Sequence, residues 1–193
     1  LSAQSGNTGG LTWAQVDTGI TSDAQGNTVA GTTAGDSFSG TDAEDNTLFG
    51  KNAGTNITTG DGNTGIGDRA VEDTTTGSGN TGLGQQALSN NTTASHNTAA
   101  GFQSLLFNTT GTSNVAIGKD ALRANTTANN NIAVGTDALT ANTTGAMNVA
   151  MGSNALDANT TANSNVAVGY DALTENTTGT QNVAVGSAAL DAN

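Results

Sequence analysis

Apolar and polar residues alternate in short segments that recur along most of the chain. In the later copies two large apolar residues flank an Ala, as in Val115-Ala116-Ile117 and Val166-Ala167-Val168. A period of two is typical of a β-strand. We therefore predict one short strand per copy, with the large residues facing the core and the Ala facing outward.

One asparagine and one glycine mark each copy. The glycine recurs at every seventeenth position without insertion, and an Asn always stands at the fourth position before it. We number the repeat from this Asn as position 1, so the glycine is position 5. The asparagines are Asn46, Asn63, Asn80, Asn97, Asn114, Asn131, Asn148, Asn165 and Asn182. The glycines are Gly50, Gly67, Gly84, Gly101, Gly118, Gly135, Gly152, Gly169 and Gly186. Nine copies in one register predict a repeat architecture.

The rest of each copy supplies a second apolar wall and a turn. A leucine stands at position 9 in seven copies, at Leu88, Leu105, Leu122, Leu139, Leu156, Leu173 and Leu190. An Asn-Thr-Thr-Gly/Ala tract comes next, in which Asn tolerates left-handed backbone and Thr favours extended backbone. One copy is too short for two helices and a loop, and Asn, Thr and Gly are weak helix formers.

These features predict an all-β fold, a β-solenoid of nine 17-residue coils stacked about 4.8 Å apart. Equivalent side chains then stack as ladders. The position 1 asparagines form one amide ladder, and a second contains Asn91, Asn108, Asn125, Asn142, Asn159 and Asn176.

The chain divides into two parts. Residues 46–193 form the solenoid, and we expect the array to continue beyond residue 193. Residues 1–45 are expected to form a strand-rich N-terminal cap or connector, because a terminal coil needs cover for its open edge. Within it, Asn27-Thr28-Val29-Ala30-Gly31 resembles an imperfect first coil, and Trp13 is expected to anchor a small core.

Composition and charge narrow the function. Thr, Ala, Gly and Asn make up 117 of the 193 residues and aromatic residues only 3%, so large side chains are too few for one thick core. The formal net charge of −12 disfavours nucleic acid and anionic lipid as partners. No apolar run is long enough to span a membrane, and the absence of Cys excludes disulfides and thiolate metal sites.

The residues that suggest site chemistry have simpler explanations. His96 is the only histidine, and no Ser-His-Asp or Cys-His arrangement can be assembled around it. We therefore expect no enzymatic activity and no cofactor, with His96 in a solvated turn. Gly65-Ile66-Gly67 and Gly82-Leu83-Gly84 resemble phosphate-binding loops, but no helix or Lys follows in the required place.

Two further patterns arise from the repeat itself. Asp120, Asp137 and Asp171 share position 7, and Asp120 and Asp137 are expected about 5 Å apart on adjacent coils. Such a pair is a weak calcium candidate, but the glycine-rich signature of calcium-binding β-rolls is absent, which favours solvated carboxylates. The asparagines of the second ladder also match the N-glycosylation acceptor pattern, although their strict period favours a structural ladder.

The strand phrase resembles a known family. Asn165 to Gly169 and Asn182 to Gly186 read Asn-Val-Ala-Val-Gly, and Asn114 to Gly118 reads Asn-Val-Ala-Ile-Gly. This phrase is similar to the head repeats of YadA-like trimeric autotransporter adhesins, which implies a left-handed parallel β-roll in a homotrimer. The longer 17-residue form, with Asp45-Asn46-Thr47-Leu48-Phe49-Gly50 leading into Asn-Thr-Thr-Gly spacers, resembles repeats of bacteriophage tail fibres, especially of marine and cyanobacterial phages. The resemblance covers residues 46–193 and specifies architecture better than function.

Three functions fit these observations. The first is a phage tail-fibre shaft in the virion tail, in which three copies of the chain associate through their outward Ala faces. This homotrimer would be attached to other tail or baseplate proteins. Its flanking domains would form a tip that binds the host receptor. The second is a trimeric adhesin at the bacterial cell surface, with the solenoid as its binding head. The third is an ice-binding solenoid using stacked Thr126, Thr143, Thr160 and Thr177.

Overall fold

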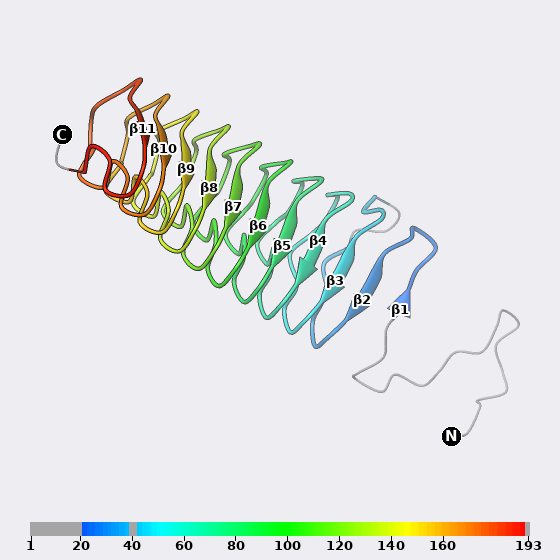
Figure 1. Cartoon of the computed structure of the whole chain (residues 1–193). Helices are drawn as coiled ribbons and strands as arrows, with labels where there is room; N and C mark the ends of the chain where they lie inside the picture. The colour runs from blue at the N-terminus through cyan, green and yellow to red at the C-terminus, as the bar shows by residue number, and fades with distance from the viewer. Residues whose placement is uncertain (1–20, 39–41, 192–193) are drawn as a thin grey trace, which may run out of the picture.

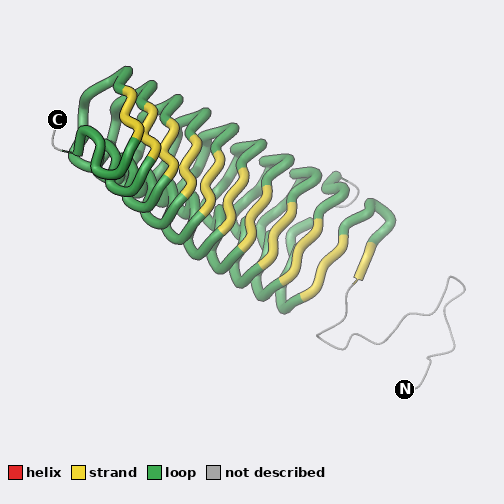
Figure 2. Tube along the Cα trace, viewed as in Figure 1, coloured by secondary structure: helices red, strands yellow, loops and turns green. Residues whose placement is uncertain are grey.

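The chain folds into a column of stacked coils, as Figures 1 and 2 show. The computed structural model describes residues 21–38 and 42–191, so Trp13 lies outside the described residues. The strands are β1 (Thr21–Ser22), β2 (Thr28–Ala30), β3 (Thr47–Phe49), β4 (Thr64–Ile66), β5 (Thr81–Leu83), β6 (Thr98–Ala100), β7 (Val115–Ile117), β8 (Ile132–Val134), β9 (Val149–Met151), β10 (Val166–Val168) and β11 (Val183–Val185). They form one sheet in chain order, and the described residues contain no helix. The predicted all-β solenoid is confirmed.

The register matches the repeat. From β3 to β11 each strand residue pairs in parallel with the equivalent residue of the next copy, as in Val166 with Val183. Strand β2 pairs in parallel with β3 after a step of 19, Thr28 opposite Thr47, so the segment around Asn27 forms a coil of its own. Strand β1 pairs antiparallel with β2 and covers the N-terminal edge of the sheet.

The chain leaves the strand at a corner that only glycine fits. The φ angles of the position 5 glycines lie between 130° and 143°, a region that side chains disfavour. A Cβ added to Gly118 would lie 2.4 Å from the carbonyl oxygen of Gly135 in the next coil. Positions 7, 9 and 17 are also left-handed, for example Asp120, Leu122 and Asn130 with φ of 53°, 52° and 61°. These turns bend each copy of the repeat into one closed coil.

The core is one thin layer between the strand and the segment that follows the glycine. We call that segment, positions 6 to 11, the turn side. Leu122 of the turn side and Ala116 of β7 are fully buried, whereas Ile117 is 43% exposed. The prediction that Val and Ile face inward and Ala outward is therefore wrong. The turn side lies so close to the strand that position 3 has room only for a small residue whenever position 9 is large.

Early coils fill this layer in a different arrangement. Leu48 at position 3 lies opposite Gly54 at position 9, whereas Gly65 lies opposite Val71. A Cβ on Gly65 would lie 2.6 Å from Cγ2 of Val71, and a Cβ on Gly54 would lie 2.6 Å from Cδ1 of Leu48. Each coil thus holds one large side chain in this layer, from one wall or from the other.

Candidate interaction surfaces

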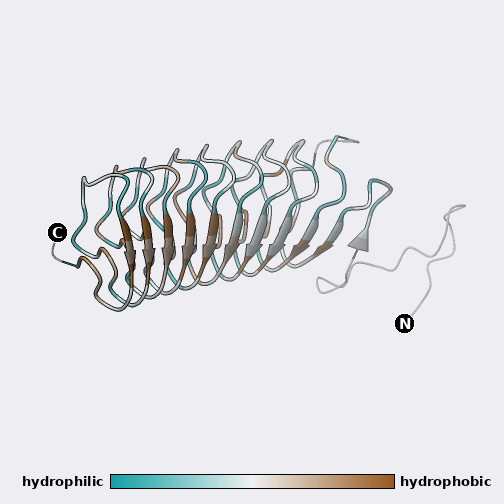
Figure 3. Ribbon diagram, turned by 45° about the horizontal axis from the view of Figure 1, so that its top comes forward, coloured by the Kyte–Doolittle hydropathy of each residue, from teal (hydrophilic) through white to brown (hydrophobic). Residues whose placement is uncertain are grey.

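The outer face of the sheet, formed by positions 2 and 4, is the main apolar surface, and we call it the strand face. On β7 to β11 it presents Val115, Ile117, Ile132, Val134, Val149, Met151, Val166, Val168, Val183 and Val185. All are half-buried or exposed in the single chain. On β3 to β6 position 2 is always Thr. In Figure 3 the strands in the middle of the column are accordingly paler than the brown strands toward the C-terminus. The apolar face that could meet another chain is therefore made of Val, Ile and Met, and the predicted Ala face is buried.

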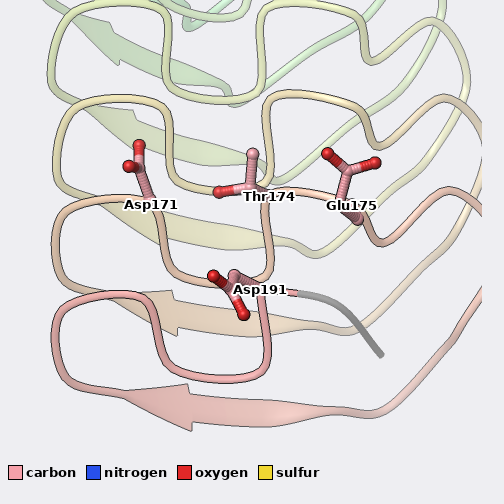
Figure 4. A pocket seen from close by; sticks show the side chains of 4 residues that line it. All are labelled: Asp171, Thr174, Glu175 and Asp191. Carbon is pink, nitrogen blue, oxygen red and sulfur yellow. The ribbon is translucent and has the colours of Figure 1, made fainter.

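The turn side is polar and acidic. From Asp68 onward every acidic residue lies at positions 6 to 11. Near the C-terminal end a hollow is lined by Asp171, Thr174, Glu175 and Asp191, shown in Figure 4. Burial of the carboxyl, together with the nearby carboxylates of Glu175 and Asp171, raises the pKa of Asp157 above its ordinary value. Across residues 21–38 and 42–191, no group of three or more His, Cys, Asp or Glu side chains could hold a metal ion.

Of the two calcium candidates, Asp120 has cationic partners. Its carboxylate lies 2.6 Å from Nζ of Lys119 and 3.4 Å from Nε of Arg123. The second contact is an ion pair without hydrogen-bond geometry. The hydrogen bond to Asp120 is the largest cause of the raised pKa of Lys119. The negative charge of Asp137, at the equivalent position on the next coil, raises this pKa less. Two side-chain cations, rather than carboxylate ligands alone, therefore surround Asp120.

The position 1 asparagines form a continuous buried ladder. The backbone N–H of each one donates to Oδ1 of the ladder Asn in the preceding coil. The first of these hydrogen bonds runs from Asn46 to Asn27 and the last from Asn182 to Asn165, both at 2.9 Å. Most also donate from Nδ2 to the same oxygen, as Asn114 does to Asn97 at 3.2 Å. The ladder gives every coil the same polar partner inside the column, which fixes the stacking register.

The second ladder is buried beside the first. Nδ2 of Asn125 donates to Oδ1 of Asn108 at 2.8 Å and to the carbonyl of Ala128 at 3.1 Å. That carbonyl also accepts Nδ2 of Asn114 at 2.8 Å, so both ladders meet at position 15. Asn108, Asn125, Asn142 and Asn159 are fully buried, so the folded chain does not present them as glycosylation acceptors.

Two rows of threonine cover the corner between the second ladder and position 15. At position 13 the hydroxyls mostly donate to the carbonyl of the equivalent Thr, as Thr126 does to Thr143 at 3.2 Å and Thr143 to Thr160 at 3.1 Å. At position 14 the threonines are exposed: Thr59, Thr76, Thr93, Thr110, Thr127, Thr144, Thr161 and Thr178. The outermost Thr row is therefore position 14, immediately after the row selected from the sequence.

The remaining candidates fall at ordinary places in the repeat. His96 is exposed at the left-handed position 17, and its backbone N–H donates to the carbonyl of Ser78. Gly65 and Ile66 lie in β4, and Gly82 and Leu83 lie in β5, so these two segments are strands that end at corner glycines.

Sequence analysis missed one group of surface residues on the turn side. Phe102 and Phe107 are 41% and 39% exposed, and the guanidinium carbon of Arg123 lies 5.1 Å from the Phe107 ring centroid. The available signal was a break in the repeat, because the equivalent positions carry small or polar residues in most other coils.

Comparison with known proteins adds no relative. None of the described residues belongs to a long apolar helix of the kind that crosses a bilayer. No family model, no curated protein and no solved structure matches the chain. Functional inference therefore depends on the surfaces described above.

Proposed function

We propose that the chain is a structural fibre segment, the shaft of a phage tail fibre, in which copies of the chain associate through the strand face. The observation that carries this proposal is the unbroken apolar face of β7 to β11, where both outward rows are Val, Ile or Met. Soluble monomers rarely expose so regular an apolar surface. Packing it against other copies removes that area from water at roughly 25 cal/mol per Å².

A homotrimer suits this arrangement. Three strand faces can meet around one axis, which directs the three turn sides, and their carboxylates, into solvent. The net charge of −12 then limits association between neighbouring fibres. Backbone hydrogen bonds join successive coils on the strand and on the turn side, for example Asp120 N to Phe102 O at 2.9 Å. Such a column is stiff and resists proteolysis, and a trimeric shaft multiplies the affinity of any tip it presents to a host receptor.

Two other functions have support of their own. The same column can serve as the head of a bacterial surface adhesin, in which case binding residues must lie on the solenoid itself. The exposed position 14 threonines favour ice binding, because they repeat at the coil spacing of about 4.8 Å. Of the three functions, only ice binding predicts thermal hysteresis in a dilute solution of the purified chain.

The test is the oligomeric state of the strand-face variants. Sedimentation equilibrium of the purified chain should give a trimer at micromolar concentration. The double variant Ile117→Lys with Met151→Lys places two charges in the interface and should sediment as a monomer. The matched control, Thr136→Lys with Tyr170→Lys, adds the same charge on the turn side and should remain trimeric. Circular dichroism verifies that both variants keep the β fold.

A monomeric wild-type chain would overturn association through this face. Equal dissociation of both double variants would do so too, because it would assign the effect to added charge and not to the strand face.

A further inference from the structure

One coil of the turn side departs from the rest of the repeat. Coil 97–113 carries Phe102 at position 6, Leu106 at position 10 and Phe107 at position 11. Of the coils that follow, only one has an aromatic residue at position 6, Tyr170, and none has a large apolar residue at position 11. Leu106 is buried, whereas Phe102 and Phe107 each keep about two fifths of their surface in water. The Leu side chain therefore supports the surface, and the two Phe rings remain available for contact.

The next coil adds two cations to these rings. Lys119 stacks one coil after Phe102, and Arg123 lies over the Phe107 ring at 5.1 Å. The Lys119 and Arg123 side chains are 58% and 39% exposed, whereas the Asp120 side chain between them is only 14% exposed. The carboxylate thus holds the cations from beneath while their charges face solvent. Stacking fixes the guanidinium plane and leaves N–H donors free.

The surrounding charge favours an anion at this place. Between Thr74 and Ala155 the sequence contains only two acidic residues, Asp120 and Asp137, and the other fourteen lie nearer the two ends. Two of the four cations of the chain, Lys119 and Arg123, fall within this stretch. An approaching anion therefore meets the least repulsion over these middle coils.

This surface stays open when copies associate through the strand face. It lies on the turn side, whose inner residues pack on the strand from the opposite side of the core, as the contact of Val71 with Gly65 illustrates. We call the two coils that carry these rings and cations, residues 97–130, the cationic window. It extends roughly 10 Å along the column. That length suits a short anionic ligand, and the acidic residues before Thr74 and after Ala155 disfavour a long polyanion.

We propose that Phe102, Phe107, Lys119 and Arg123 form a binding site for an acidic saccharide, a pyranose that carries a carboxylate. The apolar C–H face of the sugar packs on the exposed Phe rings, and the carboxylate accepts hydrogen bonds from Arg123 and Lys119. The site goes beyond the shaft function, because it gives the column a lateral receptor contact of its own.

The test uses trigalacturonate as the probe and maltotriose as its neutral counterpart, with binding measured by isothermal titration calorimetry. The repeat supplies substitutions that the coil already accepts: Phe107→Ala matches Ala124, and Arg123→Thr matches Thr140. We expect wild type to bind trigalacturonate at least tenfold more tightly than maltotriose. Each of the two variants should weaken trigalacturonate binding at least tenfold.

Matched controls lie at position 6 outside the window. Tyr170→Thr removes an exposed ring and Lys51→Ser removes an exposed cation, and both should leave binding unchanged. No binding of trigalacturonate by wild type, equal binding of maltotriose, or equal weakening in the controls would each overturn the site. Sedimentation of Phe107→Ala should match wild type, so failure of this site is distinguishable from failure of association through the strand face.

Discussion

The coils of β3 to β6 and those of β7 to β11 follow the same path with different side chains. Both groups have Asn at position 1 and Gly at position 5, and both pair strands in one register. The early group has Thr at position 2, and its core layer varies from Leu48 with Gly54 to Gly82 with Leu88. The later group has Val or Ile at position 2 and Ala with Leu in the core layer throughout.

This difference distinguishes the features that the coil needs in order to form from the outward residues that can vary without changing it. The corner, the ladder and the single large side chain of the core layer are common to both groups, so they define the coil. The outward rows contact no other part of their own coil's core, and the coil forms with Thr or with Val there. The change to Val and Ile in β7 to β11 is what the proposed association through the strand face requires, and we expect association to be tightest over that half.

The largest effect is expected at the corner shared by both groups. Gly118→Ala places a Cβ 2.4 Å from the carbonyl oxygen of Gly135 at a φ of 133°. The steric overlap and the backbone strain together should lower the free energy of unfolding by about 3–6 kcal/mol. The control is Gly62→Ala, where φ is 63° and an added Cβ meets nothing within 4 Å, with an expected cost of about 1 kcal/mol. Urea unfolding measures both losses of stability. Equal losses for Gly118→Ala and Gly62→Ala would contradict the requirement for glycine at the corner.

The core layer can be converted from the early to the late pattern. Leu48→Ala alone should cost about 2–5 kcal/mol, because a cavity remains opposite Gly54. Adding Gly54→Leu, with Ile57→Thr to make room as at Thr74, rebuilds the arrangement of Ala116 with Leu122. Urea unfolding of the triple variant should recover most of the loss. A triple variant less stable than Leu48→Ala would contradict exchange of volume between the two walls.

The asparagine ladder should give a smaller, defined loss. In Asn114→Ala the backbone N–H of Asn131 loses its acceptor at 3.0 Å, whereas Ala128 O keeps the Nδ2 of Asn125. One buried N–H without a partner should cost about 1–3 kcal/mol. Asn182→Ala, at the less buried last ladder position, should cost less than Asn114→Ala. Thermal unfolding followed by circular dichroism measures both, and the reverse order would refute the ladder's role.

The smallest effect is expected from the acidic turn side of the later group. The raised pKa of Asp157 means that its ionised form is disfavoured in the folded state. Its penalty is present at neutral pH and disappears as the pH falls through the folded pKa toward the unfolded value of about 4. Asp157→Thr, which matches Thr140 and Thr174, should therefore melt slightly above wild type at pH 7, and the difference should be smaller at pH 4. A larger gap at pH 4 than at pH 7 would contradict the burial of Asp157.

The sequence predicts the coil well because the repeat interval can be read directly from the recurring residues. The constant repeat interval, the single strand per copy and the Asn ladders follow from residues that recur in register. The orientation of the strand does not follow from alternation alone, because Val115-Ala116-Ile117 alternates equally well with either face inward. Pairs such as Leu48 with Gly54 contain the missing information, since they reveal that positions 3 and 9 share one volume. The contact of Phe107 with Arg123 depends on which positions neighbouring coils bring together, and required the three-dimensional arrangement.

The stacking of one coil per repeat can be measured directly. The chain has no Cys, so spin labels can be placed through Lys51→Cys and Ser187→Cys, which share position 6 and lie eight repeats apart. With labelled chains diluted in unlabelled ones, double electron–electron resonance should give one narrow distance of about 38 Å, eight steps of about 4.8 Å. A broad distribution, or a narrow one far from that distance, would contradict the column.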